Sequence, residues 1–155
     1  MNEDVTDREI VVSRLIEGPR PLVFDAYTEV RHVSKWWGPN GFTTTTRSFD
    51  FRPGGVWEFT MHGPDGTDYP NWIEFTEISP PSLIAYRQGT RRGDPDEFTS
   101  TVELVERGEE TEVTIRTVFA TREQRDELVK SFGAIEGAEQ TLDRLNVYMK
   151  RTEGE

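Results

Sequence analysis

The feature of this sequence that most restricts its fold is a change in the spacing of its apolar residues near residue 120. Between residues 43 and 119, apolar and polar residues alternate in short segments such as "GVWEFTMHG". In the segment that begins at Thr121, apolar residues recur every three or four positions from Leu128 to Met149. Alternation is typical of half-buried β-strands, and the second spacing is typical of an amphipathic helix. The chain therefore predicts a sheet followed by a long helix.

Six strands are predicted within the alternating region, at intervals of about 8–14 residues with short turns between them. Glycine- and proline-containing segments such as "PGG", "GPDG" and "SPP" separate them. This arrangement predicts that consecutive strands pair antiparallel as a meander. In chain order the strands are "TTTTRSFDF", "GVWEFTMHG", "YPNWIEFTEI", "SLIAYRQ", "FTSTVELVE" and "TEVTIRTVF".

Two features precede these strands. The stretch "REIVVSRLI" alternates and is rich in β-branched residues, so it predicts a further strand that ends before Gly18. The segment from Pro21 to Trp37 has apolar residues at helical spacing and predicts one or two short helices. Pro21 suits the first turn of a helix, and Gly38 followed by proline stops the pattern.

The C-terminal stretch begins with a capping box, "TREQ", in which Thr121 and Gln124 satisfy free backbone N–H groups at a helix start. The apolar stripe that follows spans about eight turns. Gly133 and Gly137 lie inside it, and glycine weakens a helix, so we expect a break or kink there. The order of elements is strand, two short helices, six strands and a long helix, which is an α+β architecture.

The sheet has to bury one face, and the C-terminal stripe is the large apolar surface available to cover it. A sheet curved around one helix leaves space between the two. Aromatic residues on the inner face make that space a candidate ligand pocket. We therefore expect the helix to clamp against a bent sheet without filling the room beneath it.

Composition limits the functions open to this chain. Its 155 residues suit one domain, with a core from about residue 8 to 150. The net charge of −11 opposes nucleic-acid binding. The apolar runs are far shorter than the roughly 20 residues that span a bilayer, so no membrane insertion is expected. The lack of cysteine excludes thiol chemistry and Cys-based zinc sites. The N-terminus has no signal-peptide pattern, so we expect a cytoplasmic location.

With its elements in this order, the sequence resembles the helix-grip fold of START-like (SRPBCC) proteins, β-α-α-β(6)-α. It resembles in particular the branch related to the C-terminal domain of the activator of Hsp90 ATPase. The resemblance implies a curved antiparallel sheet wrapped around the C-terminal helix, with a deep apolar cavity between them. The superfamily includes lipid carriers and polyketide cyclases, so the fold does not fix the chemistry. The matching stretches are "RLIEGPRPLVFDAYTEVRHVSKWWGP", "FDFRPGGVWEFTMHGPDGTDYPN", "FTEISPPSLIAY" and "GAEQTLDRLNVYM".

The adjacent tryptophans of "KWWGPNGF" are the first candidates for the cavity wall. Neighbouring helical residues point roughly 100° apart, so we expect one of Trp36 and Trp37 to line the cavity and the other to support it. Trp57, Phe59 and Met61 share one face of a strand and are expected to form the pocket floor.

The remaining candidates come from the later strands and the C-terminal helix. Which face of residues 70–78 points inward stays open, because a bulge near Pro70 would reverse it. Tyr86 is a possible polar fixture that could orient a ligand carbonyl. The full candidate set is Trp36, Trp37, Trp57, Phe59, Met61, Trp72, Glu74, Tyr86, Phe119, Ala138 and Leu142.

Residues for catalysis or metal binding are scarce. Glu58 and Glu74 come nearest to a carboxylate pair, which could split its pKa values into an acid and a base. His32 and His62 lack the spacing of a metal site, and no nucleophile motif is present. We therefore predict no catalytic residue, metal or cofactor.

Three functions remain, in order of preference. The first is binding of a small hydrophobic or aromatic ligand. The second is a chaperone-accessory role, in which the exposed part of "KWWGPNGF" and the acidic surface contact an Hsp90 homologue. The third is a polyketide-cyclase-like enzyme with Glu74 or Tyr86 as acid or base. A homodimer is compatible with each.

Overall fold

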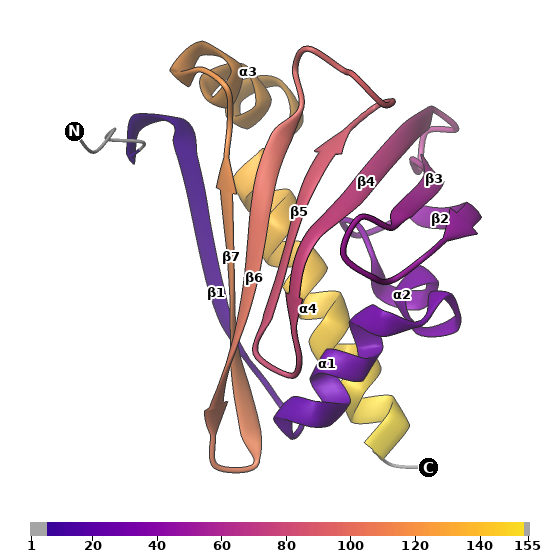
Figure 1. Ribbon diagram of the computed structural model, residues 1–155, viewed down its shortest axis with the longest axis vertical. Helices are drawn as coiled ribbons and strands as arrows, with labels where there is room; N and C mark the ends of the chain where they lie inside the picture. The colour runs from indigo at the N-terminus through magenta and orange to yellow at the C-terminus, as the bar shows by residue number, and fades with distance from the viewer. Residues whose placement is uncertain (1–5, 154–155) are drawn as a thin grey trace.

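The computed structural model describes residues 6–153, in which seven antiparallel strands form one sheet in the order β1-β7-β6-β5-β4-β3-β2 (Figure 1). Strands β2 to β7 follow one another as the predicted meander, and β1 pairs with β7. The strands are β1 (Glu9–Ile16), β2 (Thr43–Phe49), β3 (Val56–His62), β4 (Asp68–Ser79), β5 (Leu83–Gly89), β6 (Phe98–Arg107) and β7 (Glu110–Val118).

The helices occupy the predicted positions. A short 3-10 turn, η1 (Thr6–Arg8), precedes β1. The helices are α1 (Arg20–Thr28), α2 (Val30–Trp36), α3 (Arg122–Phe132) and α4 (Ala134–Glu153). This order confirms the α+β helix-grip architecture.

The predicted break in the C-terminal helix is confirmed at Gly133. This residue has φ 59° and ψ 45°, the left-handed conformation that glycine adopts without strain, and it caps α3. The capping box at the start of α3 is confirmed in part. The Thr121 hydroxyl accepts a hydrogen bond from the Gln124 N–H at 3.0 Å, but the Gln124 amide reaches Ala120, one residue before the cap.

Helix α4 crosses one face of the sheet, and α1 and α2 lie beside its C-terminal half (Figure 1). Its residues Leu142, Leu145 and Met149 are buried in the main hydrophobic cluster. The first turns of α4, by contrast, contain Ala134, Gly137 and Ala138, which have a small side chain or none and leave more of the space above the sheet open. Within residues 6–153, none of the helices combines the length and apolar composition needed to cross a membrane.

The inward face of β4 is the one that carries Ile73 and Phe75, which are 1% and 5% exposed. Trp72 and Glu74 therefore point to the opposite face, because successive strand residues alternate. The irregularity in this strand lies between Phe75 and Glu77, where the pairing with β5 shifts register. This irregularity comes after Trp72 and Glu74 in the chain, so it does not change the face of the sheet on which their side chains lie.

Candidate functional site

A pocket of about 320 Å³ lies between the inner face of the sheet, the end of α2 and the junction of α3 with α4. We call it the inner pocket. Strands β5, β6 and β7 run side by side beneath it, and α4 passes across them (Figure 1). Of the eleven candidate residues, those that line the inner pocket are Trp36, Trp37, Met61, Tyr86, Phe119 and Ala138.

The adjacent tryptophans differ from the expectation that only one of them would line the pocket. Trp36 is 1% exposed, and its indole N–H donates to the Ala26 carbonyl at 3.2 Å. Trp37 is half-buried and contributes its ring to the same pocket. The helix ends at Trp36, and Trp37 is already extended at φ −63° and ψ 135°. The 100° separation of helical neighbours therefore does not apply to this pair.

Trp57, Phe59 and Leu142 lie in the core and not in the pocket wall. The Trp57 and Phe59 rings stack 3.9 Å apart, and Trp37 contacts them edge-on at 4.9 and 6.1 Å. Leu142 is completely buried. Alternation correctly predicted that the Trp57 and Phe59 rings lie on the inner face of the sheet. They do not line the pocket, however, and the Trp37 indole packs against both of them. These residues support the wall that Trp37 forms.

Trp72 and Glu74 lie on the outer face of the sheet, away from the inner pocket. Glu74 pairs with Arg87 at 2.8 Å. The Trp72 ring contacts the guanidinium groups of Arg87 and Arg92, whose centres are 5.7 and 5.4 Å from its centroid. Glu58 shares the outer face and is 3.8 Å from Arg47. The carboxylate pair that could have served catalysis is therefore not directed at the pocket.

Metal chemistry finds no support in the described part of the chain. Among residues 6–153, no group of three or more His, Asp or Glu side chains could hold a metal ion. His62 bonds Asp68 at 2.7 Å, and His32 bonds the Tyr148 hydroxyl at 2.5 Å. Both histidines therefore take part in local pairs.

A row of hydroxyl groups crosses the inner pocket. Tyr86 on β5 pairs directly with Ser100 on β6, and Ser100 pairs with Thr117 on β7. All three line the pocket, and the Ser100 and Thr117 hydroxyls lie 3.0 Å apart. Neither Ser100 nor Thr117 was among the candidate residues, although each alternates with apolar residues along its strand. The signal that could have found them was the register of three neighbouring strands.

The two tyrosines of the pocket are held in their neutral form. Burial raises the pKa of Tyr86 to about 12, although a hydrogen bond with Ser100 acts in the opposite direction. Burial also raises the pKa of Tyr27 well above its usual value, and the neighbouring Tyr86 raises it further. Both phenols therefore remain hydrogen-bond donors near neutral pH.

The raised pKa of Tyr86 predicts an alkaline limit to stability. In the unfolded chain this tyrosine ionises near pH 10, whereas in the folded protein its pKa is about 12. Its stabilising contribution is therefore complete below about pH 10 and is lost as the pH rises toward about 12. Urea unfolding between pH 9 and 11.5 should show this decline, and Tyr86→Phe should make it shallower. An identical decline in the variant would contradict the assignment.

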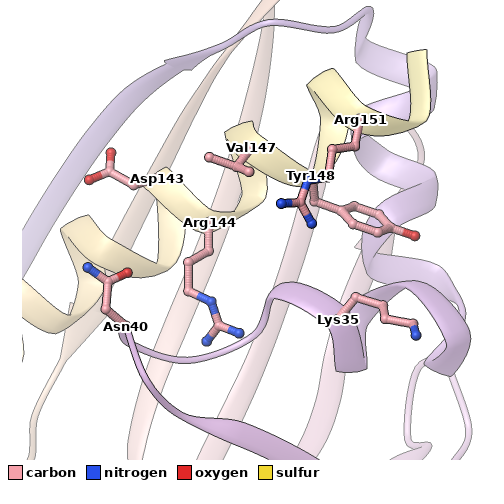
Figure 2. A pocket seen from close by; sticks show the side chains of 7 residues that line it. All are labelled: Lys35, Asn40, Asp143, Arg144, Val147, Tyr148 and Arg151. Carbon is pink, nitrogen blue, oxygen red and sulfur yellow. The ribbon is translucent and has the colours of Figure 1, made fainter. Parts of the chain in front are cut away.

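A second pocket, of about 450 Å³, is lined by residues of α2, of the loop that follows it and of the C-terminal half of α4 (Figure 2). Arg144 points from α4 toward this loop, and its Nη1 donates to the carbonyl oxygens of Trp37, Gly38 and Pro39 at 3.1, 2.9 and 2.9 Å. Partial burial lowers the pKa of Arg144. Arg144 therefore anchors the loop after α2 to α4, and this loop places Trp37 in the wall of the inner pocket.

Comparison with known proteins identifies the family. The model of the Activator of Hsp90 ATPase homolog 1-like proteins (AHSA1) matches residues 17–150. The chain belongs to this family. The family assignment and the helix-grip fold confirm the resemblance inferred from the sequence motifs. Among curated proteins, none matches the chain.

Solved structures share the fold over nearly the whole chain. A protein of Nitrosomonas europaea is 25% identical, with a TM-score of 0.86 over 97% of this chain and 99% of that one. A protein of Arthrobacter aurescens is 23% identical, with a TM-score of 0.86 over 97% and 90%. An AHSA1 protein of Silicibacter pomeroyi is 17% identical, with a TM-score of 0.75 over 93% and 99%.

Proposed function

We propose that this protein binds a small hydrophobic or aromatic molecule in the inner pocket, in the cytoplasm. The observation that supports this most strongly is the composition of the pocket wall. Its rings come from separate elements, with Trp37 after α2, Phe98 on β6 and Phe119 after β7. Apolar walls with a few polar groups are the usual form of a ligand site.

The size of the pocket favours a compact ligand. Its volume of about 320 Å³ is at the lower end of the range of roughly 300–1,000 Å³ found for small-molecule sites. A molecule of two or three rings suits this space better than a long lipid chain. The helix-grip fold and the membership of the AHSA1 family are consistent with such a role.

The proposal is tested by filling the pocket. Ala138 lies on α4 and lines the pocket, so Ala138→Phe should occupy the space that a ligand needs. With N-phenyl-1-naphthylamine, a neutral probe that fluoresces in apolar surroundings, we expect saturable binding to the unmodified protein. The variant should bind the probe at least about tenfold more weakly, a difference of about 1.4 kcal/mol.

The matched control is Val147→Phe, which adds the same ring to the same helix at a side chain that is 51% exposed and does not line the inner pocket. It should leave the probe affinity unchanged. Equal loss in both variants, or no saturable binding to the unmodified protein, would reject the proposal.

The family description favours a second candidate, an accessory role with an Hsp90 homologue. Such a role would need an exposed contact surface outside the tryptophan pair, since Trp36 is buried and Trp37 is directed into the pocket. The ATPase rate of a purified Hsp90 homologue separates the two. Ligand binding alone predicts no change on adding this protein, and a saturable increase would support the accessory role.

A further inference from the structure

The inner pocket is free of formal charge. Among the described residues that line it, none is Asp, Glu, Lys, Arg or His. The ionisable side chains in the lining are Tyr27 and Tyr86, and burial raises the pKa of both. A bound carboxylate or ammonium group would lose its hydration without meeting a counter-charge, which is costly.

The hydroxyl row nevertheless gives this pocket a polar side. The Tyr86, Ser100 and Thr117 hydroxyls have three hydrogens between them. The bond between the Ser100 and Thr117 hydroxyls uses one of these, and the interaction through which Ser100 lowers the pKa of Tyr86 uses at most one more. At least one O–H hydrogen of the row therefore remains for another acceptor.

Tyr27 supplies a second donor in the same lining. Its side chain is 5% exposed, and its hydroxyl has no hydrogen-bond partner among residues 6–153. The neighbouring Tyr86 raises the pKa of Tyr27, in addition to the larger effect of burial. A buried hydroxyl without a partner costs free energy, and an acceptor on a ligand would recover part of that cost.

Most of the remaining lining is apolar. Its other polar side chains, Gln88 and Thr141, donate to the Asn71 amide oxygen at 3.0 Å and to the Gly137 carbonyl at 2.8 Å. Ile10, Val102 and Ile115 lie on the strands around the row, and Leu128 and Ala138 face them from α3 and α4. An occupant that satisfies both parts of the lining is apolar over most of its surface and has an acceptor at one end.

We propose that the inner pocket selects neutral, mainly apolar molecules that carry a carbonyl oxygen, and that this oxygen accepts hydrogen bonds from the hydroxyl row and Tyr27. This inference rests on the proposed binding function and adds the chemical class of the ligand. It excludes the carboxylate and ammonium analogues of the same molecule.

Three compounds that share the naphthalene ring system test whether the pocket selects a neutral ligand with a carbonyl oxygen. The ketone 2-acetylnaphthalene carries the acceptor, 2-ethylnaphthalene has a similar shape without it, and 2-naphthoate carries a negative charge. Titration calorimetry at pH 7.5 should show that the ketone binds about fivefold to tenfold more tightly than the hydrocarbon, the contribution of one neutral hydrogen bond. The carboxylate should bind at least about 100-fold more weakly than the ketone.

Variants that lack these hydroxyls test whether the hydroxyls cause the preference for the ketone. The triple variant Tyr86→Phe, Ser100→Ala and Thr117→Val removes the whole row, so no partner in it is left unpaired. It should lose most of the preference for the ketone over the hydrocarbon, and adding Tyr27→Phe to it should abolish the preference that remains. Tyr27→Phe removes a hydroxyl without a partner, so it should reduce the preference for the ketone without lowering the melting temperature.

The outcomes separate this inference from the proposed function. Equal affinity of the unmodified protein for ketone and hydrocarbon would overturn the selection for a carbonyl and leave the binding function intact. Binding of 2-naphthoate as tight as that of the ketone would overturn the exclusion of charge. Absence of binding by all three compounds, together with no binding of N-phenyl-1-naphthylamine, would overturn both proposals. A variant that lacks all four hydroxyls, with Tyr27→Phe added to the triple variant, and that still prefers the ketone would place the acceptor elsewhere.

Discussion

Replacing Trp36 with alanine is expected to lower the free energy of unfolding by about 3–5 kcal/mol, the range typical of a large aromatic core residue. The Trp36 ring is 1% exposed and contacts the Tyr27 ring edge-on at a centroid distance of 4.8 Å. The substitution leaves a cavity and also removes the donor that the buried Ala26 carbonyl accepts from. Urea unfolding followed by circular dichroism at 222 nm measures the change.

Trp37→Ala provides the contrast within the same dipeptide. The Trp37 ring is half-buried, and part of its surface faces the inner pocket. We expect a smaller loss of stability than for Trp36→Ala, but a larger loss of affinity for N-phenyl-1-naphthylamine than Val147→Ala produces. Val147 is 51% exposed, so its truncation should change stability by less than about 0.5 kcal/mol. Equal losses of stability for the two tryptophans would contradict the expectation that the more deeply buried ring contributes more to stability.

The periodicity of apolar residues was sufficient to predict the architecture. Alternation from residue 43 and helical spacing from Thr121 gave the sheet, its meander and the covering helix, because each pattern reflects which face of an element is buried. The break at Gly133 was also predictable, since glycine weakens a helix and adopts the left-handed cap conformation without strain.

The identity of the pocket residues was less accessible, because it depends on where elements end and how strands align. A helix end displaced by one residue changes the direction of Trp37, which is extended and not helical. The parity of β4 could not be assigned while the position of its bulge was unknown, so Trp72 and Glu74 were assigned to the pocket although they lie on the outer face. Sequence patterns cannot fix such boundaries to a single residue.

The hydroxyl row was also not predictable from the sequence pattern. Ser100 and Thr117 each occur in a strand as an ordinary small polar residue. They become a site feature because the registers of β5, β6 and β7 place Tyr86, Ser100 and Thr117 next to one another. Strand register is a long-range property, and the turns between the strands do not by themselves specify it.

Arg144→Met is expected to weaken both the fold and the ligand site. The variant keeps the apolar part of the side chain but loses the Nη1 bonds to three consecutive carbonyl oxygens. Because these bonds share one nitrogen and its two hydrogens, their contributions do not add fully. We expect a loss of about 1.5–3 kcal/mol in unfolding free energy, the range for a hydrogen bond from a charged group. Release of the loop that carries Trp37 should also lower probe affinity about fivefold to tenfold.

Arg151→Met is the matched control, because Arg151 lines the same second pocket as Arg144 (Figure 2) and its substitution removes the same charge. Arg151 is exposed, and within residues 6–153 no hydrogen bond or ion pair is observed for its guanidinium. Its substitution should change stability and affinity little, since single exposed charges contribute little. If Arg144→Met lowers probe affinity no more than Arg151→Met does, the link between α4 and the pocket wall is wrong. If Arg144→Lys restores only part of the affinity, the carbonyl contacts and not the charge alone hold the loop, because an ammonium group cannot reproduce the guanidinium geometry.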